Sequence, residues 1–342
     1  MKAVQLIAKR SMSVVDVPDP GPPGPGDVLV RIARVGICGS DVHYYADGKI
    51  GSQIVEYPWT VGHEAAGTVL AVGRGVSRVR PGDRIAVDPA MPCHSCDQCL
   101  AGRPHTCRNM RFLACPGQVE GCLSEQFVLP EASCLLLPDK MSLEQAALVE
   151  PLSVGLYGVV LSPSPRAKKV AVLGAGPIGL CVLMVALNEG AAPAIVTEPI
   201  AARRAVARDC GADAVVDSAD AELLVSEHGG GVDIVYECCG RQEALDLALE
   251  LLTPGGTLML IGIPEENRIS FDINLLRRKE LQVRSVRRQN GCMQRALDMI
   301  ASGEVDAGRL VTHRFDLGRT PEAFDLVSRY ADGVVKAVVS LD

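Results

Sequence analysis

The stretch that most constrains the fold is KKVAVLGAGPIGLCVLMVALNEG, residues 168–190. Val170–Leu187 is nearly continuous apolar sequence of about membrane-spanning length. Three glycines and a proline fall together between positions 174 and 179, however, and they divide it into a short β-branched run, a turn and a helical run. We therefore predict a buried strand followed by a helix rather than a membrane span.

The sequence on either side of this stretch has two different patterns. From about Ser153 to Arg288, strand-like and helix-like runs alternate, which predicts a parallel sheet covered by helices with right-handed crossovers. From Met1 to about Ala90, short alternating runs are broken by Pro and Gly, which predicts irregular antiparallel β structure. After Arg288 a helix and a β-rich tail follow, too few elements for a domain of their own. The tail is therefore expected to return to the first domain.

Composition and charge argue against several classes of partner. Hydrophobic residues make up 48% of the chain and aromatic residues only 4%, so aliphatic side chains must form the core, as in helix-covered parallel sheets. The net charge is −7 and basic residues do not gather with aromatics, which argues against nucleic-acid and anionic-membrane partners. The first twenty residues contain no apolar segment of signal-peptide type, so we predict a cytoplasmic protein.

Thirteen cysteines, an odd number, favour metal or thiol chemistry over a disulfide framework. The strongest local signal is CHSCDQCLAGRPHTC, and its two-residue gaps between thiols suit tetrahedral Zn²⁺. Four thiolates close the coordination sphere, which is typical of a structural site; an iron–sulfur cluster is the alternative, and His94 and His105 could compete as ligands. The predicted structural zinc ligands are Cys93, Cys96, Cys99 and Cys107.

A second set of metal-binding residue types is scattered along the chain. Cys38 lies in GICGSDVHYY, His63 and Glu64 in VGHEAAGTV, and Glu150 in ALVEPLSVG. A Cys, a His and a carboxylate can form a three-ligand catalytic zinc site whose fourth position is open. Spacing alone supports this set only weakly, because a lone Cys after a strand usually packs and a His–Glu pair is usually at the surface.

The turn GAGPIG predicts dinucleotide binding because it follows a strand and precedes a helix. Gly174, Gly176 and Gly179 would allow the tight turn, the close approach of a pyrophosphate, and close helix packing. The next strand ends in Glu198, whose carboxylate would accept hydrogen bonds from the ribose hydroxyls and repel a 2′-phosphate, favouring NAD over NADP. Arg203 and Arg204 could instead favour NADP, because their positive charges would attract its 2′-phosphate. We interpret them as the solvated face of a helix.

With these residues in place, the whole chain resembles the zinc-containing medium-chain alcohol dehydrogenases, and most closely their polyol or sorbitol (L-iditol 2-) dehydrogenase branch. The motifs that carry the resemblance occur in the family's order: GICGSDVHYYADGKIG, VGHEAAGTVLAVGRGV, the four-cysteine lobe, EPLSVG, VLGAGPIG and LVTHRF. The resemblance implies an α/β protein. It would have a GroES-like β-rich catalytic domain, residues 1–152 and 289–342 with the zinc lobe at about 90–110, and a Rossmann doubly wound NAD-binding domain, residues 153–288.

The resemblance also implies roles for individual residues. Cys38, His63 and Glu64 match catalytic zinc ligands, Glu150 matches a second carboxylate at the metal, and Asp41 matches the acid that orients the zinc-bound histidine. Ser40 and His43 match a proton relay, and Tyr44 and Arg287 match substrate contacts. The implied dinucleotide contacts beside the three glycines are Pro177, Ile178, Glu198, Arg203, Ile261 and Arg287.

The implied function is transfer of a hydride from a secondary alcohol of a polyol to NAD, with two zinc ions per chain. Arg288 stands where polyol members often have an aromatic residue, so the alternatives are an acidic or cyclic hydroxylated substrate, such as L-idonate or an inositol, or L-threonine. A homodimer or homotetramer is expected, and GGTLMLIGIP resembles the edge-strand region through which such Rossmann domains pair.

Overall fold

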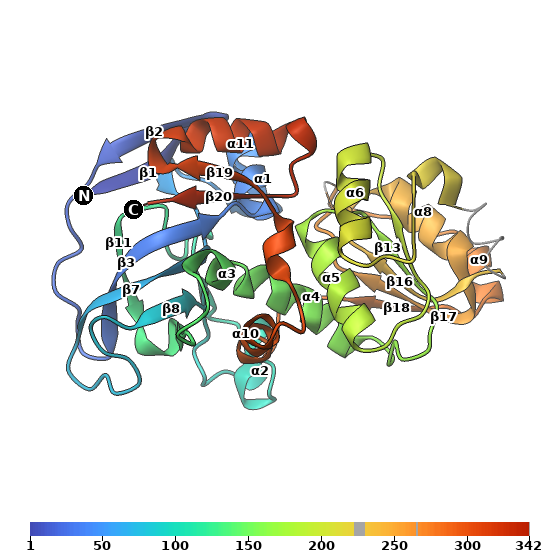
Figure 1. Ribbon diagram of the computed structural model, residues 1–342, viewed down its shortest axis with the longest axis horizontal. Coiled ribbons are helices and arrows are strands. Elements are labelled where there is room, and N and C mark those ends of the chain that lie inside the picture. Colours follow the sequence, from blue (N-terminus) through green and yellow to red (C-terminus); the bar gives the residue numbers. More distant parts are fainter. Residues whose placement is uncertain (222–229, 265, 342) are drawn as a thin grey trace. The chain divides into compact units, whose positions relative to one another are not determined.

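The computed structural model describes residues 1–221, 230–264 and 266–341, and it divides into two compact units (Figure 1). The first unit contains Met1–Glu150, Met293–Ala301 and Val311–Asp342. The second contains Pro151–Cys292 and Ser302–Leu310. The chain passes from the first unit to the second after Glu150 and returns to the first at Met293. The domain boundaries expected from the sequence, at 152/153 and 288/289, lie near these two points and stay a prediction.

The second unit is built on one six-stranded sheet in which all neighbouring strands are parallel. Numbered along the chain, its strands lie in the order 3-2-1-4-5-6 of a doubly wound Rossmann fold. In spatial order they are β15 (Ala214–Val216), β14 (Ala194–Thr197), β13 (Val170–Leu173), β16 (Val232–Glu237), β17 (Leu252–Leu260) and β18 (Gln282–Ser285). The predicted helix-covered parallel sheet is confirmed.

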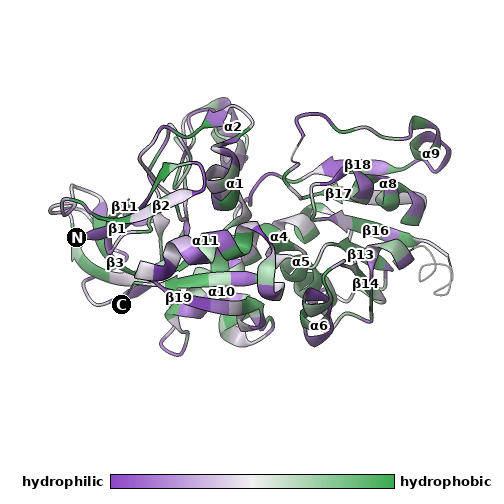
Figure 2. Ribbon diagram, turned by 90° about the horizontal axis from the view of Figure 1, so that it is seen from above, coloured by the Kyte–Doolittle hydropathy of each residue, from purple (hydrophilic) through white to green (hydrophobic). Residues whose placement is uncertain are grey.

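Helices cover both faces of this sheet, with α5 (Pro177–Asn188) and α6 (Ala201–Asp209) on one face and α8 (Gln242–Leu251) on the other (Figure 1). Figure 2 colours α5 mostly toward the hydrophobic end of the scale and α6 with more hydrophilic residues. Most of α5 is buried, which explains why its sequence is apolar all round. The apolar stretch at Val170–Leu187 is thus a strand and a core helix, and no described helix is long and apolar enough to cross a membrane.

One prediction about this sheet is wrong. The segment GGTLMLIGIP was expected at an edge, but β17 lies between β16 and β18, and the edge strands are β15 and β18. The apolar run in β17 is what a strand buried between neighbours needs. Strand β18 has only four residues, all exposed, and one of them is the charged Arg284, so its sequence shows no apolar pattern.

The first unit is β-rich, and its main sheet is built around β3 (Asp27–Gly36). The order is β12 (Cys134–Leu136), β8 (Arg84–Val87), β7 (Glu64–Val72), β3, β20 (Lys336–Ser340) and β19 (Val311–Asp316), with β11 (Gln126–Pro130) also paired to β3. A second sheet joins β2 (Ser11–Asp16), β1 (Lys2–Ala8) and β6 (Trp59–Thr60). Because β20 pairs with β3, the end of the chain completes the sheet that its beginning starts.

Short elements complete both units. The short strands are β4 (Lys49–Ile50), β5 (Gln53–Ile54), β9 (Ala90–Met91) and β10 (Arg111–Phe112). The remaining helices are α1 (Gly39–Asp47), α2 (Asp97–Leu100), α3 (Leu143–Ala147), α4 (Val149–Leu161), α9 (Ile273–Arg278), α10 (Met293–Ser302) and α11 (Thr320–Ser328). Helix α1 begins directly after β3 and Cys38, and thereby fixes several predicted site residues in one place.

Candidate metal and dinucleotide sites

The glycine-rich turn between β13 and α5 has the geometry that a pyrophosphate requires. Gly174 has a φ of +98°, and a Cβ on Gly179 would lie 1.9 Å from the Gly174 carbonyl oxygen, so both positions need glycine. A Cβ on Gly176 would meet nothing within 4 Å, which leaves open space at the start of α5. Among the described residues no side chain caps the N-terminus of α5, so its first N–H groups are available to an anion. The turn therefore fits a dinucleotide.

Glu198, which follows β14, is buried beside this turn. Its Oε2 accepts the N–H of Ala175 at 2.8 Å and its Oε1 accepts the N–H of Ile200 at 3.0 Å. Each oxygen keeps a second lone pair for a ribose hydroxyl. The carboxylate thus ties the glycine turn to the end of the neighbouring strand, a role that the sequence did not indicate.

The two arginines of α6 do not form the solvated face that we expected. Arg203 is buried, and Arg204 donates to the carbonyl oxygens of Glu198 and Pro199 and to Asp217. Arg204 is therefore committed to the chain around β14. The physical reason is that α6 begins just after the strand, so its first turn packs against the strand end.

Sequence reasoning missed Glu237, the last residue of β16. It is buried, and its Oε1 accepts the N–H groups of Cys239 and Gly240, both at 2.6 Å. Burial raises the pKa of Glu237, and these two bonds oppose the shift. The signal was present, because this strand ends in Val-Tyr-Glu and β14 ends in Val-Thr with Glu198 directly after it. The parallel register brings both strand ends to the edge of the glycine turn.

Other predicted dinucleotide contacts lie in the same unit. Pro177 and Ile178 are half-buried at the start of α5, and the half-buried Ile261 directly follows β17. Arg287 is exposed beyond β18, and Arg288 is half-buried with a φ of +53°. Their contacts with cofactor or substrate stay predictions.

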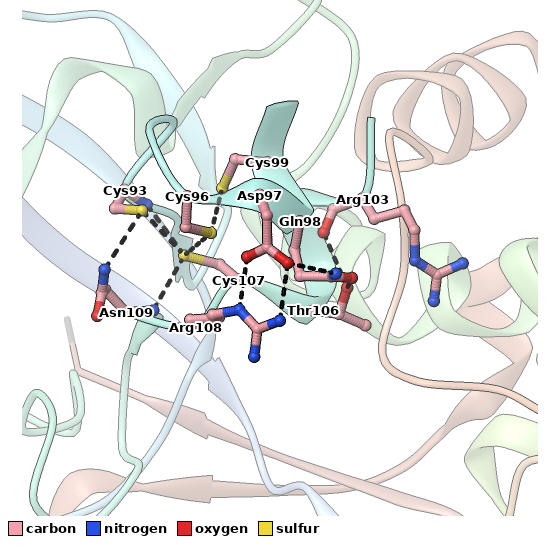
Figure 3. A network of polar contacts seen from close by, with 10 residues as sticks. All are labelled: Cys93, Cys96, Asp97, Gln98, Cys99, Arg103, Thr106, Cys107, Arg108 and Asn109. Atoms are coloured by element: carbon pink, nitrogen blue, oxygen red, sulfur yellow. Dashed lines mark hydrogen bonds and ion pairs between the residues drawn. The ribbon is translucent and has the colours of Figure 1, made fainter. Parts of the chain in front are cut away.

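The four predicted structural zinc ligands come together in a lobe of the first unit (Figure 3). Their sulfur atoms all lie within 4.8 Å of one another. Their sulfur atoms are 3.6 Å apart in Cys96–Cys99, 3.9 Å in Cys96–Cys107 and 3.4 Å in Cys93–Cys107. A zinc ion with Zn–S bonds of about 2.3 Å in a tetrahedron would set them about 3.8 Å apart. The cluster therefore fits zinc, and among the described residues no histidine joins it.

The lobe also supports the thiolates electrostatically. The N–H groups of Cys93 and Asn109 donate to Cys107 Sγ, each at 3.3 Å. Hydrogen bonds from Ser95 lower the pKa of Cys93 to about 5, whereas burial raises that of Cys99 to about 12. Arg108 makes a two-point ion pair with Asp97 across the lobe (Figure 3).

Two members of the scattered set, Cys38 and His63, come together at the start of α1, whereas the described structure does not bring Glu64 or Glu150 within 4.8 Å of both. Ser40 Oγ lies 3.3 Å from Cys38 Sγ, and His63 Nδ1 lies 3.4 Å from Asp41 Oδ1. Burial lowers the pKa of His63, but the charge and hydrogen bonding of Asp41 and Cys38 outweigh it and raise the pKa well above the usual value. Within the described structure Asp41 Oδ2 has no hydrogen-bond partner, and the 3.4 Å contact between His63 Nδ1 and Asp41 Oδ1 is not a well-formed hydrogen bond. Buried polar atoms that lack hydrogen-bond partners and lie beside a thiol are suited to a metal centre.

The two glutamates of the set have different surroundings. Burial raises the pKa of Glu150 to about 7; the charges of Glu64 and Asp88 also raise it, while His63 and Lys336 lower it, so Glu150 belongs to the same charged cluster. Glu64 is 1% exposed and forms an ion pair with Lys336, Nζ to Oε2 at 2.7 Å. Sequence reasoning missed Lys336, a single lysine in the apolar run VVKAVV.

The predicted proton-relay residues and one predicted substrate contact lie on α1. His43 Nδ1 is 3.5 Å from Asp47 Oδ2, and the buried Tyr44 donates its hydroxyl proton to Gln53 Oε1 at 3.0 Å. Ser40, His43 and Tyr44 therefore follow one another along one short helix, for which Cys38 is the N-cap.

Two family matches cover most of the chain. Residues 24–139 match the family described as alcohol dehydrogenase GroES-like domain. Residues 177–302 match the family described as zinc-binding dehydrogenase.

Individual relatives agree with these matches. The chain is 33% identical to a sorbitol dehydrogenase of Bacillus subtilis, over 99% of this chain and 97% of the relative. An oxidoreductase of unknown specificity from Escherichia coli superposes with a TM-score of 0.94 at 30% identity, covering 100% of this chain and 99% of the other. A zinc-binding dehydrogenase from Sinorhizobium meliloti, bound to NADP, superposes with a TM-score of 0.90 at 32% identity over 99% of both chains. The chain thus belongs to the zinc-containing medium-chain alcohol dehydrogenases, in their polyol or sorbitol dehydrogenase branch.

Proposed function

We propose that the chain oxidises a secondary alcohol of a polyol and transfers the hydride to NAD. The observation that carries the proposal is the position of the buried His63, which contacts both the Cys38 thiol and the Asp41 carboxylate at the start of α1. When bound there, zinc would polarise the alcohol oxygen, and NAD would accept the hydride. A second zinc ion would be held by the four-cysteine lobe, giving two per chain.

The chain's own residues would orient the metal ligands and move the proton. Asp41 lies against Nδ1 of His63, which favours the tautomer with Nε2 unprotonated and available as a ligand. The Ser40 hydroxyl, next to the Cys38 sulfur, would accept the proton released by the alcohol while it passes its own proton on toward His43, one turn further, and His43 would release a proton to solvent. Tyr44 already donates its proton to Gln53, so its oxygen would act as an acceptor toward a substrate hydroxyl.

Buried acidic side chains favour a polyol and NAD. Glu150 is buried beside His63 and would contact the metal or accept hydrogen bonds from a neighbouring hydroxyl of the substrate. Glu198 supports NAD, because its buried carboxylate would face the ribose and repel a 2′-phosphate, and Arg204 is engaged elsewhere.

Arg288 supports a second candidate substrate class. It is half-buried in a left-handed backbone conformation, so its position is set by the fold rather than by solvent. A guanidinium facing the substrate would favour an acidic substrate such as an aldonate, since its fork of donors matches a carboxylate. A polyol remains the first proposed substrate. We also propose that the chain forms a homodimer or homotetramer and that it acts in the cytoplasm.

The test is the rate of nicotinamide reduction on a panel of pentitols, hexitols, inositols, aldonates and L-threonine, with NAD and NADP in parallel. We expect the highest kcat/KM for a polyol with NAD. Arg288→Tyr is the matched variant, and a selective loss of activity on aldonates would favour the second substrate class. Activity confined to threonine, or a preference for NADP in the unaltered chain, would contradict the proposal.

A further inference from the structure

Gln53 joins two buried side chains of the first unit. The Tyr44 hydroxyl donates to Gln53 Oε1 at 3.0 Å, and Gln53 Nε2 donates to the sulfur atom of Cys115 at 2.7 Å. Tyr44 and Cys115 are buried, and Gln53 is half-buried. We call these three side chains the amide network. Both polar ends of the amide are engaged in it, one by a hydroxyl proton and the other by a sulfur atom.

A sharp reversal of the chain brings Gln53 back to Tyr44. Helix α1 ends at Gly48, which has a φ of +73° and donates its N–H to the Tyr44 carbonyl oxygen. Strands β4 and β5 then form a hairpin around a two-residue loop, in which Ile50 pairs with Gln53. Because Gln53 directly follows this loop, its side chain can reach the helix that has just ended.

Both ends of the amide network lie next to residues that contact His63. Asp41, which contacts His63 Nδ1, and Tyr44 are both buried and are three residues apart on α1, so they share one face of that helix. Phe112, three residues before Cys115, packs against His63 with ring centroids 5.5 Å apart. The amide network therefore lies beside the site at which the alcohol would bind.

The network decides which kind of group the tyrosine can recognise. A tyrosine hydroxyl has one proton to donate, and the proton of Tyr44 is given to an amide oxygen, so its oxygen can only accept a further hydrogen bond. The contact of Nε2 with Cys115 favours this orientation of the amide. A hydroxyl group of a polyol can donate to the Tyr44 oxygen, whereas an ionised carboxylate only accepts hydrogen bonds and would be repelled.

We propose that Gln53 is a positioning residue that makes the Tyr44 hydroxyl a hydrogen-bond acceptor, so that the site selects a substrate with a hydroxyl donor there over one with a carboxylate. The inference rests on the proposed function and deepens it, because it assigns the preference for a neutral polyol over an aldonate to one amide. Gln53 acts through Tyr44 and does not touch the reacting atoms.

The test uses pairs of substrates that differ only at one end, where the polyol has a CH₂OH group and the aldonate a carboxylate. The pairs are xylitol with D-xylonate, D-sorbitol with D-gluconate, and L-iditol with L-idonate, and kcat and KM are measured with NAD. We expect the unaltered protein to prefer the polyol. Gln53→Met keeps the length of the side chain but has no oxygen for the tyrosine proton. It should lower the polyol-to-aldonate ratio of kcat/KM at least fivefold, mainly through a higher KM for the polyol.

Three further variants separate positioning from a merely structural role. Gln53→Glu still accepts the tyrosine proton, so it should keep the preference of the unaltered protein for the polyol. Tyr44→Phe removes the oxygen itself, so it should lower the ratio at least as far, and adding Gln53→Met to it should lower the ratio no further. Ser52→Ala changes the exposed neighbour of Gln53 in the hairpin loop and should leave the ratio unchanged.

The outcomes separate the inference from the function on which it rests. A polyol preference that is unchanged in Gln53→Met, or that falls further when Gln53→Met is added to Tyr44→Phe, overturns the inference alone. If Gln53→Met does not fold, Tyr44→Phe decides, because an unchanged ratio there means that the tyrosine oxygen does not select the substrate. An unaltered protein that oxidises no polyol contradicts the proposed function and this inference with it.

Discussion

At the scale of single residues, two glycines of the same turn should fail in different ways when changed to alanine. Gly179→Ala places a methyl group 1.9 Å from the Gly174 carbonyl oxygen, so we expect a loss of about 1–3 kcal/mol in the free energy of unfolding. Gly176→Ala meets open space at a φ of −73°, so the fold should be unaffected, while the methyl group occupies the room left for a pyrophosphate. Thermal unfolding and the Kd for NAD, measured on both variants, check this pair.

The pair serves as its own control, because each variant adds one methyl group to the same turn. Equal losses of stability in the two variants would show that the close approach of Gly179 to Gly174 is not what requires glycine. Undiminished NAD binding by Gly176→Ala would mean that the dinucleotide does not lie on this turn.

A half-buried carboxyl should make stability depend on pH. Burial raises the pKa of Asp88 from 3.8 to about 6, while the N–H of Ala90 opposes the shift. Because the native state then binds more protons than the unfolded state, this group lowers stability as the pH rises from about 4 through 6, by at most about 3 kcal/mol. Asp88→Asn keeps an oxygen acceptor for Ala90 and removes the charge.

We therefore expect Asp88→Asn to be more stable than the unaltered chain at pH 8, and its advantage to be about 1 kcal/mol smaller at pH 5. Denaturant unfolding at the two values measures it, with the exposed Asp139→Asn as control. An advantage that is the same at both values, or that is larger at pH 5, would contradict the raised pKa.

At the scale of elements, local patterns predicted the structure well where the chemistry is local. The strand–turn–helix at Val170–Leu187 and the four-cysteine lobe are each determined within about twenty residues of sequence, by an apolar run with glycines in one case and by thiol spacing in the other. The edge strand β18 was missed because its four exposed residues carry no apolar period. A strand without a buried face leaves no periodic signal.

Contacts between strands that are distant in the sequence could not be predicted, for a different reason. Glu64 and Lys336 are 272 positions apart, and they meet only because β20 pairs with β3, which pairs with β7. Spacing along the chain could place Cys38, His63 and Glu64 in one candidate set, but it could not show which carboxylate a buried lysine already holds.

The zinc lobe should depend on its thiolates far more than on its charge pair. Arg108 and Asp97 are largely exposed, so Arg108→Ala should cost less than about 1 kcal/mol and leave the zinc content unchanged. Cys107→Ser removes a sulfur atom that contacts two other cysteines and accepts two N–H bonds, so the lobe should lose its zinc and its order. Zinc content and protease cleavage within residues 90–110 measure both effects. Loss of zinc in Arg108→Ala would contradict this prediction.

At the scale of the whole molecule, two zinc centres of different construction should separate on mild chelation. The four-cysteine cluster gives a closed coordination sphere, and a closed sphere offers a chelator no vacant position. The site at Cys38 and His63 would keep one position open for substrate, so its zinc should leave first, and activity should fall in proportion. A stronger chelator should then remove the second zinc ion and lower the melting temperature, because binding energy at a structural site is folding energy.

The order of loss is what distinguishes a catalytic from a structural metal, so zinc per chain, activity and melting temperature should be followed on one sample. Adding zinc back after the mild step should restore activity without a change in the melting temperature of the lobe, since the four thiolates never lost their ion. Cys38→Ser is the matched control, because it removes one thiolate from the open site and none from the lobe: it should bind one zinc ion, resist the mild chelator and show no activity. Activity that survives loss of the first zinc ion, or loss of both ions at one rate, would mean that the open site does not perform the chemistry, and the hydride transfer would then need another explanation.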